Sequence, residues 1–168
     1  MERRITQVLL ILFSIGILAC QEVKYPEPQP SWKSEKKRFP KKMRGTYVNE
    51  KGEKAIEINE FTAALNEGDK YVSSIDLRSD TVQIKKWRAV YFVNIKEKEE
   101  EYWNGAFVEV EKDTIFLSYM DESIELLEKL TKVQRENADG DYIINPERKE
   151  WKAILEQMSF TTTKYVKN

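Results

Sequence analysis

The chain has 168 residues, with 28 basic and 29 acidic side chains and no histidine. Its near-neutral charge gives no overall attraction to nucleic acid. The missing imidazole excludes Ser-His-Asp and Cys-His nucleophilic centres and the zinc sites that need histidine.

The N-terminus has the pattern of an export signal. Arg3 and Arg4 form a basic start, an apolar run covers residues 5–18, and Cys20 follows. The run is shorter than the roughly 20 residues that a membrane-spanning helix needs. We therefore predict a signal peptide over residues 1–19, whose removal changes the net charge from −1 to −2 because it carries Arg3, Arg4 and one glutamate.

The sequence Ile17-Leu18-Ala19-Cys20 resembles the lipobox of bacterial lipoproteins. This resemblance implies a lipid on the Cys20 thiol, and two or more acyl chains hold a protein stably to a membrane. Gln21 follows, where aspartate tends to retain lipoproteins in the inner membrane. The resemblance thus implies a lipid-anchored protein of the bacterial cell envelope, at the outer membrane, facing either the periplasm or the outside. The alternative is an ordinary signal peptide with an accidental cysteine.

The next segment has the composition of a tether. Pro26, Pro28 and Pro30 alternate with polar residues, a pattern that favours extended polyproline geometry. A basic cluster follows, which either touches anionic lipid head groups or forms a solvated spacer. We expect the lipidated cysteine and tether to cover residues 20–38 and one β-rich domain to cover 39–168.

Alternating apolar and polar residues predict strands through most of this domain. Ile56 and Ile58 alternate with polar neighbours, and residues 89–95 are apolar on both faces, which is typical of a central strand. The charged turn at 111–113 predicts a hairpin between its flanking runs. The expected strands lie at residues 46–48, 56–58, 71–77, 82–85, 89–95, 102–110, 114–120, 133–136, 142–144 and 160–166.

Two helices are expected in the second half of the chain, the first over residues 122–132. For the second, Asn145 is the expected N-cap and Pro146 the first helical residue. Its apolar stripe predicts packing on a sheet and consists of Trp151, Ile154, Leu155 and Met158. We therefore predict a mainly β (β-rich α+β) fold, an antiparallel meander sheet or small barrel with two short helices, the C-terminal one packed on the sheet.

Gly45-Thr46-Tyr47 resembles the G-x-W that opens lipocalin-type barrels, with tyrosine in place of tryptophan. The resemblance covers residues 44–168 and implies a meander that ends in a helix and a strand, with Tyr47 at one end of the sheet. The same tripeptide, with the later Asn-Pro helix and its tryptophan, resembles small uncharacterised lipoproteins of the Bacteroidota. That second likeness implies no known activity.

Aromatic side chains are the candidate ligand contacts. Trp87 and Trp103 neighbour turns or charged loops, so we expect partial exposure, and with Tyr47 they are candidates for binding an apolar molecule or a glycan. Packing in the core is the alternative for all three. The predicted partners are the membrane, through Cys20, and an unidentified protein or small ligand.

No residue pattern predicts a cofactor or a metal site. Asn137, Asp139 and Asp141 resemble a calcium loop, but the first and twelfth positions of an EF-hand fall on Arg135 and Pro146, so a tight turn is favoured. We predict a non-enzymatic binding module. The alternative is a carboxylate-based hydrolase of the cell envelope that uses a pair such as Glu109 and Glu111 or Asp121 and Glu122.

Overall fold

The computed structural model describes residues 22–67, 70–120, 124–135 and 140–168, most of which belong to one curled β-sheet. The strand order is β11-β12-β1-β9-β10-β13-β3-β4-β5-β6, and β8, β7 and β2 extend the sheet from the other edge of β9. The strands are β1 (Val23–Tyr25), β2 (Glu35–Lys36), β3 (Gly45–Asn49), β4 (Lys54–Ile58), β5 (Thr62–Glu67), β6 (Lys70–Asp76), β7 (Val82–Trp87), β8 (Val90–Ile95), β9 (Trp103–Glu111), β10 (Thr114–Met120), β11 (Val133–Arg135), β12 (Tyr142–Ile144) and β13 (Phe160–Lys167). The helices are η1 (Lys41–Met43), α2 (Ile124–Leu130) and α3 (Arg148–Gln157).

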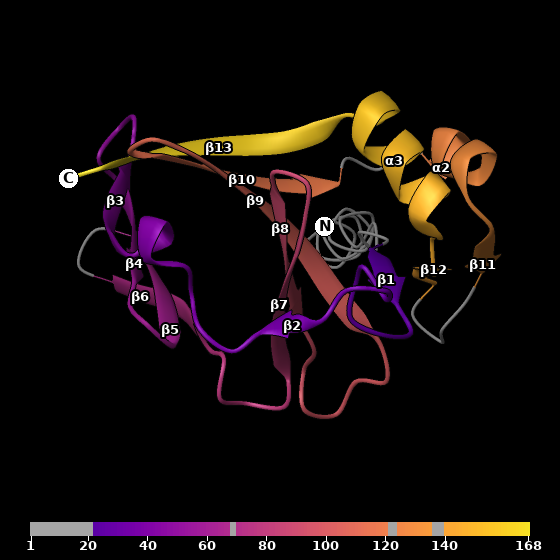
Figure 1. Ribbon diagram of the computed structural model, residues 1–168, viewed down its shortest axis with the longest axis horizontal. Coiled ribbons are helices and arrows are strands. Elements are labelled where there is room, and N and C mark those ends of the chain that lie inside the picture. The colour runs from indigo at the N-terminus through magenta and orange to yellow at the C-terminus, as the bar shows by residue number, and fades with distance from the viewer. Residues whose placement is uncertain (1–21, 68–69, 121–123, 136–139) are drawn as a thin grey trace, which may run out of the picture.

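The sheet curls into a half-barrel. Strands β3 to β6 form one wall, β7 to β9 form the opposite wall, and the long strands β10 and β13 join the two (Figure 1). Among the described residues, β6 pairs with β5 and β7 pairs with β8 and β2, so no pairing joins β6 to β7. The pairing is antiparallel throughout except between β1 and β12. This arrangement confirms the predicted mainly β class.

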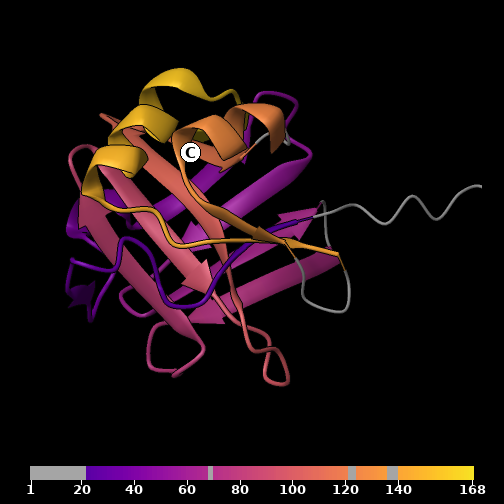
Figure 2. The ribbon, with the colours of Figure 1, turned by 90° about the vertical axis from the view of Figure 1, so that its right-hand side faces the viewer.

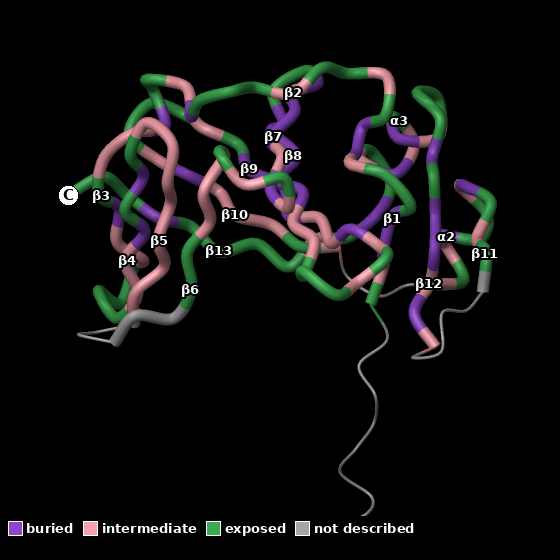
Figure 3. Tube along the Cα trace, turned by 90° about the horizontal axis from the view of Figure 1, so that it is seen from below, coloured by how far each residue is buried: buried purple, intermediate pink, exposed green. Residues whose placement is uncertain are grey.

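Each face of the central strands has its own hydrophobic core, and Figure 3 shows that much of β7 and β8 is buried. In β8, Tyr91 and Val93 belong to the inner core, whereas Val90 and Phe92 belong to the outer core, which confirms a central strand covered on both faces. The inner core fills the half-barrel and consists of Phe39, Met43, Tyr47, Ile56, Ile58, Ile84, Tyr91, Val93, Ala106, Val108, Ile115 and Tyr165. The outer core consists of Tyr25, Trp87, Val90, Phe92, Trp103, Phe107, Leu127, Ile144, Trp151, Ile154 and Met158.

Helix α3 covers the outer core, as its apolar stripe predicts. Figure 2 shows α2 and α3 side by side on one face of the sheet. Trp151 and Ile154 are fully buried, and the Trp151 ring meets the Phe92 ring edge-on, with 5.0 Å between the ring centroids. The N-cap residue is Glu147, which forms a capping box with Glu150.

The predicted N-cap, Asn145, is therefore wrong, and its side chain has another role. Its Oδ1 accepts a hydrogen bond from Gln29 Nε2 at 2.8 Å, and its Nδ2 donates to Glu27 Oε1 at 3.1 Å. These bonds hold the N-terminal segment against the domain. The helix consequently begins at Arg148, two residues after Pro146.

The predicted tether over residues 20–38 is wrong for the part that the structure describes. Strand β1 pairs in parallel with β12 and antiparallel with β9, and β2 pairs with β7. Tyr25 and Gln29 are 2 % and 1 % exposed. The folded domain thus includes residues 22–38 and does not begin at Phe39.

One buried asparagine fixes this segment to β8. Asn94 Oδ1 accepts a hydrogen bond from the Gln29 backbone N–H at 2.6 Å, and Asn94 Nδ2 donates to the Gln29 carbonyl at 2.8 Å. The Gln29 side chain in turn accepts a hydrogen bond from Trp151 Nε1 at 3.0 Å. Because buried polar groups must find partners inside the protein, this network makes a proline-rich segment part of the core.

A buried ion cluster holds the start of β1 beside β12. Lys24 Nζ lies 3.0 Å from an Asp141 carboxylate oxygen and 3.3 Å from Glu100. The Glu22 backbone N–H donates to Asp141 Oδ1 at 3.1 Å. Burial lowers the pKa of Lys24, but hydrogen bonds and charges from the two carboxylates outweigh it, so the pKa lies above its ordinary value.

Candidate functional site

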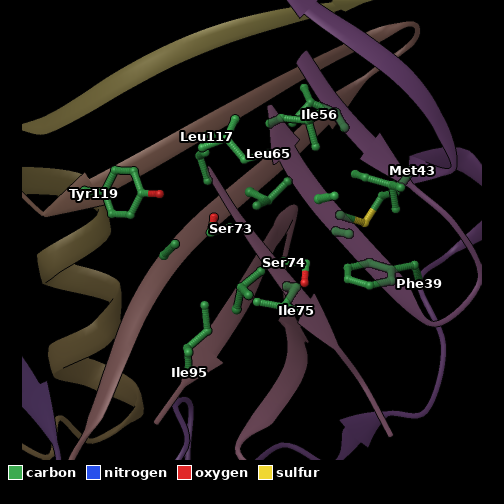
Figure 4. Close-up of a pocket in the computed structure, with 17 residues that line it drawn as sticks. Phe39, Met43, Ile56, Leu65, Ser73, Ser74, Ile75, Ile95, Leu117 and Tyr119 are labelled. Atoms are coloured by element: carbon green, nitrogen blue, oxygen red, sulfur yellow. The ribbon is translucent and has the colours of Figure 1, made fainter. Parts of the chain in front are cut away.

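The inner face of the half-barrel contains an apolar groove of about 130 Å³ (Figure 4). Its walls come from β4, β5, β6, β8, β9 and β10, and Phe39 and Met43 lie on the side opposite Tyr119 and Ile95. The residues that line it are Phe39, Met43, Ile56, Ile58, Ala63, Ala64, Leu65, Ser73, Ser74, Ile75, Val93, Ile95, Ala106, Val108, Ile115, Leu117 and Tyr119. None of these lining side chains is charged.

The groove reaches the surface at a polar rim. Ser73 and Ser74 are exposed, and Tyr119 is 50 % exposed. In Figure 4 the Tyr119 hydroxyl points toward Ser73. Burial raises the pKa of Tyr119, so the phenol stays neutral and able to donate a hydrogen bond well above neutral pH. The site therefore combines an apolar interior with an uncharged polar opening.

The β9–β10 hairpin builds one wall of the groove by strict alternation. Ile115, Leu117 and Tyr119 of β10 line it, while Phe116 and Ser118 lie on the other face, as the two-residue period of a strand requires. The turn between the strands uses Lys112 in the left-handed region at φ 51°. The sequence predicted this hairpin, and the structure confirms it.

A second cavity, of about 340 Å³, adjoins the groove. The two share Ile95, Ala106 and Tyr119 as lining residues. The second cavity is also lined by Glu22 and Val23, at the start of β1. The second cavity thus lies between the first described residues of the chain and the groove.

The predicted ligand contacts Trp87 and Trp103 lie elsewhere. They are 6 % and 7 % exposed and belong to the outer core, so the expected partial exposure is wrong. The neighbouring cations cover them: the Arg88 guanidinium carbon lies 4.9 Å from the Trp87 ring centroid, and Lys96 Nζ lies 5.4 Å from the Trp103 ring. Cation–π contacts thus help to shield both rings, one from the adjacent Arg88 and one from Lys96, which directly follows the preceding strand, β8.

Tyr47, the third candidate, is fully buried in the inner core. Its hydroxyl donates a hydrogen bond to the Lys42 carbonyl at 3.3 Å, and burial together with the Asp113 charge raises its pKa. Tyr47 is not among the residues that line the groove. The structure therefore places none of the three predicted residues in the groove and assigns that role to half-buried side chains such as Leu117 and Tyr119.

The predicted carboxylate pair on β9 lies at the surface, and the carboxylates of Asp141 and Glu100, which do come together, both contact Lys24. Glu109 and Glu111 are exposed on β9, and Asp141, the one buried acid among the described side chains, is paired with Lys24. No cluster of three potential metal ligands occurs among these residues. The other residues singled out by sequence lie outside the described ranges, namely Cys20, Asp121, Glu122, Asn137 and Asp139.

Comparison with known proteins identifies no relative. No family model, curated protein or solved structure matches the chain. Within the described ranges, no helix has both the length and the apolar character that crossing a membrane requires.

Proposed function

We propose that this chain is a lipid-anchored protein of the bacterial cell envelope whose half-barrel binds an apolar ligand without catalysis. The observation that supports binding is the groove, whose walls are apolar and whose only polar lining groups are Ser73, Ser74 and the Tyr119 hydroxyl. An apolar ligand is favoured over a glycan because Trp87 and Trp103 offer no free ring face for stacking on a sugar.

The anchor is the lipobox cysteine, Cys20, and Gln21 after it favours the outer membrane. Mass spectrometry of the protein extracted from membranes tests this assignment. We expect an N-terminal residue that corresponds to Cys20, with the added mass of a diacylglyceryl group and a third acyl chain. A free thiol, or a mature chain that still carries residues 1–19, would contradict it.

The volume of the groove sets the size of the ligand group. At about 130 Å³ it is close to the ~150 Å³ apolar cavity that holds one benzene molecule. Burial of four to six methylenes, at about 0.8 kcal/mol each, contributes roughly 3–5 kcal/mol. That free energy corresponds to a millimolar dissociation constant. The groove is therefore suited to the end of an apolar chain.

A series of n-alkanols tests this binding on the mature chain with Cys20→Ser, which keeps every described residue. The readout is the NMR shift of the methyl groups of Ile115 and Leu117. Each added methylene should tighten binding about fourfold, the equivalent of ~0.8 kcal/mol, until the groove is full. We expect Ser73→Trp, at the rim, to weaken binding about tenfold, or ~1.4 kcal/mol.

The control is Ser34→Trp, which places the same side chain at an exposed serine outside the groove. It should bind the alkanols like the parent chain. Methyl shifts that are absent, that do not depend on chain length, or that respond equally to both tryptophan variants would refute binding in the groove.

A further inference from the structure

We propose that the groove holds one acyl chain of the protein's own lipid, the group attached to Cys20. This inference rests on the proposed lipid anchor. Its first support is that the folded domain already begins at Glu22, with no flexible tether from there on. The Glu22 backbone N–H donates a hydrogen bond to Asp141, and β1 begins at the next residue, Val23. Two Cα–Cα steps of 3.8 Å keep the Cys20 Cα within about 7.6 Å of the Glu22 Cα. A free tether would instead have allowed a separation of tens of ångströms.

The second support is the path from that point into the half-barrel. Glu22 and Val23 line the second cavity, and this cavity shares Ile95, Ala106 and Tyr119 with the groove. An acyl chain on Cys20 would therefore start near the second cavity, and the three shared residues form the border that it would cross to reach the groove.

The lining is more polar in the second cavity than in the groove, which fits a lipid with polar esters and an apolar chain. Glu22, Asn104 and the Tyr119 hydroxyl provide polar groups around the second cavity, where the glyceryl esters would lie. Beyond them the lining is apolar, with Leu117, Ile115 and their neighbours. The groove would thus bury the end of the hydrocarbon chain and leave the ester groups near water.

Tethering favours the protein's own chain over an apolar ligand that is dilute in solution. The groove alone corresponds to millimolar binding, so dilute free ligands would leave it mostly empty. A ligand joined by a short linker has an effective concentration in the millimolar range, which matches that affinity. One chain can occupy the groove while the remaining chains on Cys20 keep the protein on the bilayer, since two signals suffice for stable anchoring.

Photocrosslinking of the lipidated full-length product tests this directly. Cells are grown with a fatty acid that carries a terminal diazirine, so that the acyl chains on Cys20 become photoreactive. The purified protein is reconstituted in lipid nanodiscs and irradiated, and the adducts are mapped by peptide mass spectrometry. We expect intramolecular adducts on β5, β6 and β10, at groove residues such as Leu65, Ile75 and Leu117.

Variants of two exposed serines define the outcome, and neither removes a buried side chain. Ser73→Trp at the rim should lower the yield of these adducts about tenfold, equivalent to ~1.4 kcal/mol, whereas Ser34→Trp should leave the yield unchanged. Adducts confined to nanodisc lipids, or equally frequent in both variants, would overturn the inference. If that happens while the alkanols still bind, only the inference fails. If the alkanols do not bind, or Cys20 carries no lipid, the proposed function fails.

Discussion

Replacement of Asn94 by alanine should both destabilise the domain and release its N-terminal segment. The side chain satisfies the backbone N–H and carbonyl of Gln29, at 2.6 and 2.8 Å, and both residues are 1 % exposed. Each buried group left without a partner costs about 1–3 kcal/mol, so the free energy of unfolding should fall by roughly 2–5 kcal/mol. Domains of this kind have about 5–15 kcal/mol in total, and at ~2–4 °C per kcal/mol the Tm should fall by roughly 5–15 °C.

Urea denaturation followed by tryptophan fluorescence measures the loss of stability, and hydrogen exchange reports the Gln29 amide. We expect the Gln29 amide to lose protection in Asn94→Ala before the amides of β8 do. The control is Asn59→Ala, because Asn59 is exposed and its side chain donates to Glu57, so its effect should stay within about 0.5 kcal/mol. A decrease in the free energy of unfolding below 1 kcal/mol for Asn94→Ala, or unchanged protection of the Gln29 amide, would refute the role given to the Asn94–Gln29 hydrogen bonds.

Two further predictions concern the same region. Lys24→Met should lower the free energy of unfolding by roughly 2–4 kcal/mol at pH 7, because the buried Asp141 carboxylate loses its ion pair with Lys24. The pKa of Lys24 is raised, so the stability from its charge is present below about pH 10.4 and is lost as the pH rises through the folded-state pKa. The difference in urea midpoint between Lys24→Met and the parent chain should therefore narrow as the pH rises through the folded-state pKa of Lys24, and a constant difference would contradict this. Gly105→Ala places a Cβ 2.9 Å from the buried Tyr25 ring and should lower the free energy of unfolding by about 1–3 kcal/mol. An unchanged urea midpoint would refute this close contact.

The sequence was most informative where a local period decides the structure. The run over 89–95 is apolar at every position except Asn94, and the strand is covered on both faces. The stripe through Trp151 and Ile154 packs on the sheet as its helical spacing requires. Strand β5 was not predicted, because Ala63 and Leu65 alternate with small or weakly polar neighbours and give little contrast in hydropathy.

The remaining errors share one cause, which is that partners distant in sequence decide the outcome. Pro26, Pro28 and Pro30 rule out a helix, but nothing in their spacing shows that Asn94, more than 60 residues away, bonds Gln29. Trp87 likewise looks exposed beside a turn until Arg88 and Trp32 cover it. For the groove, the sequence did contain a signal, because the alternation in β10 places Leu117 and Tyr119 on one face. In the structure neither side chain is fully buried, and both line the groove.

The docking of the N-terminal segment changes what the apolar groove can do. With a free tether, the anchor and the groove would be independent, and any ligand would have to arrive from solution. In the proposed lipoprotein, the pairing of β1 with β9 and β12, secured by Lys24 and Asn94, would instead keep the lipid-bearing Cys20 near the second cavity. We then expect the start of β1 to lie beside the membrane. Under this proposal, the segment whose composition suggested a spacer would bring the groove to the lipid.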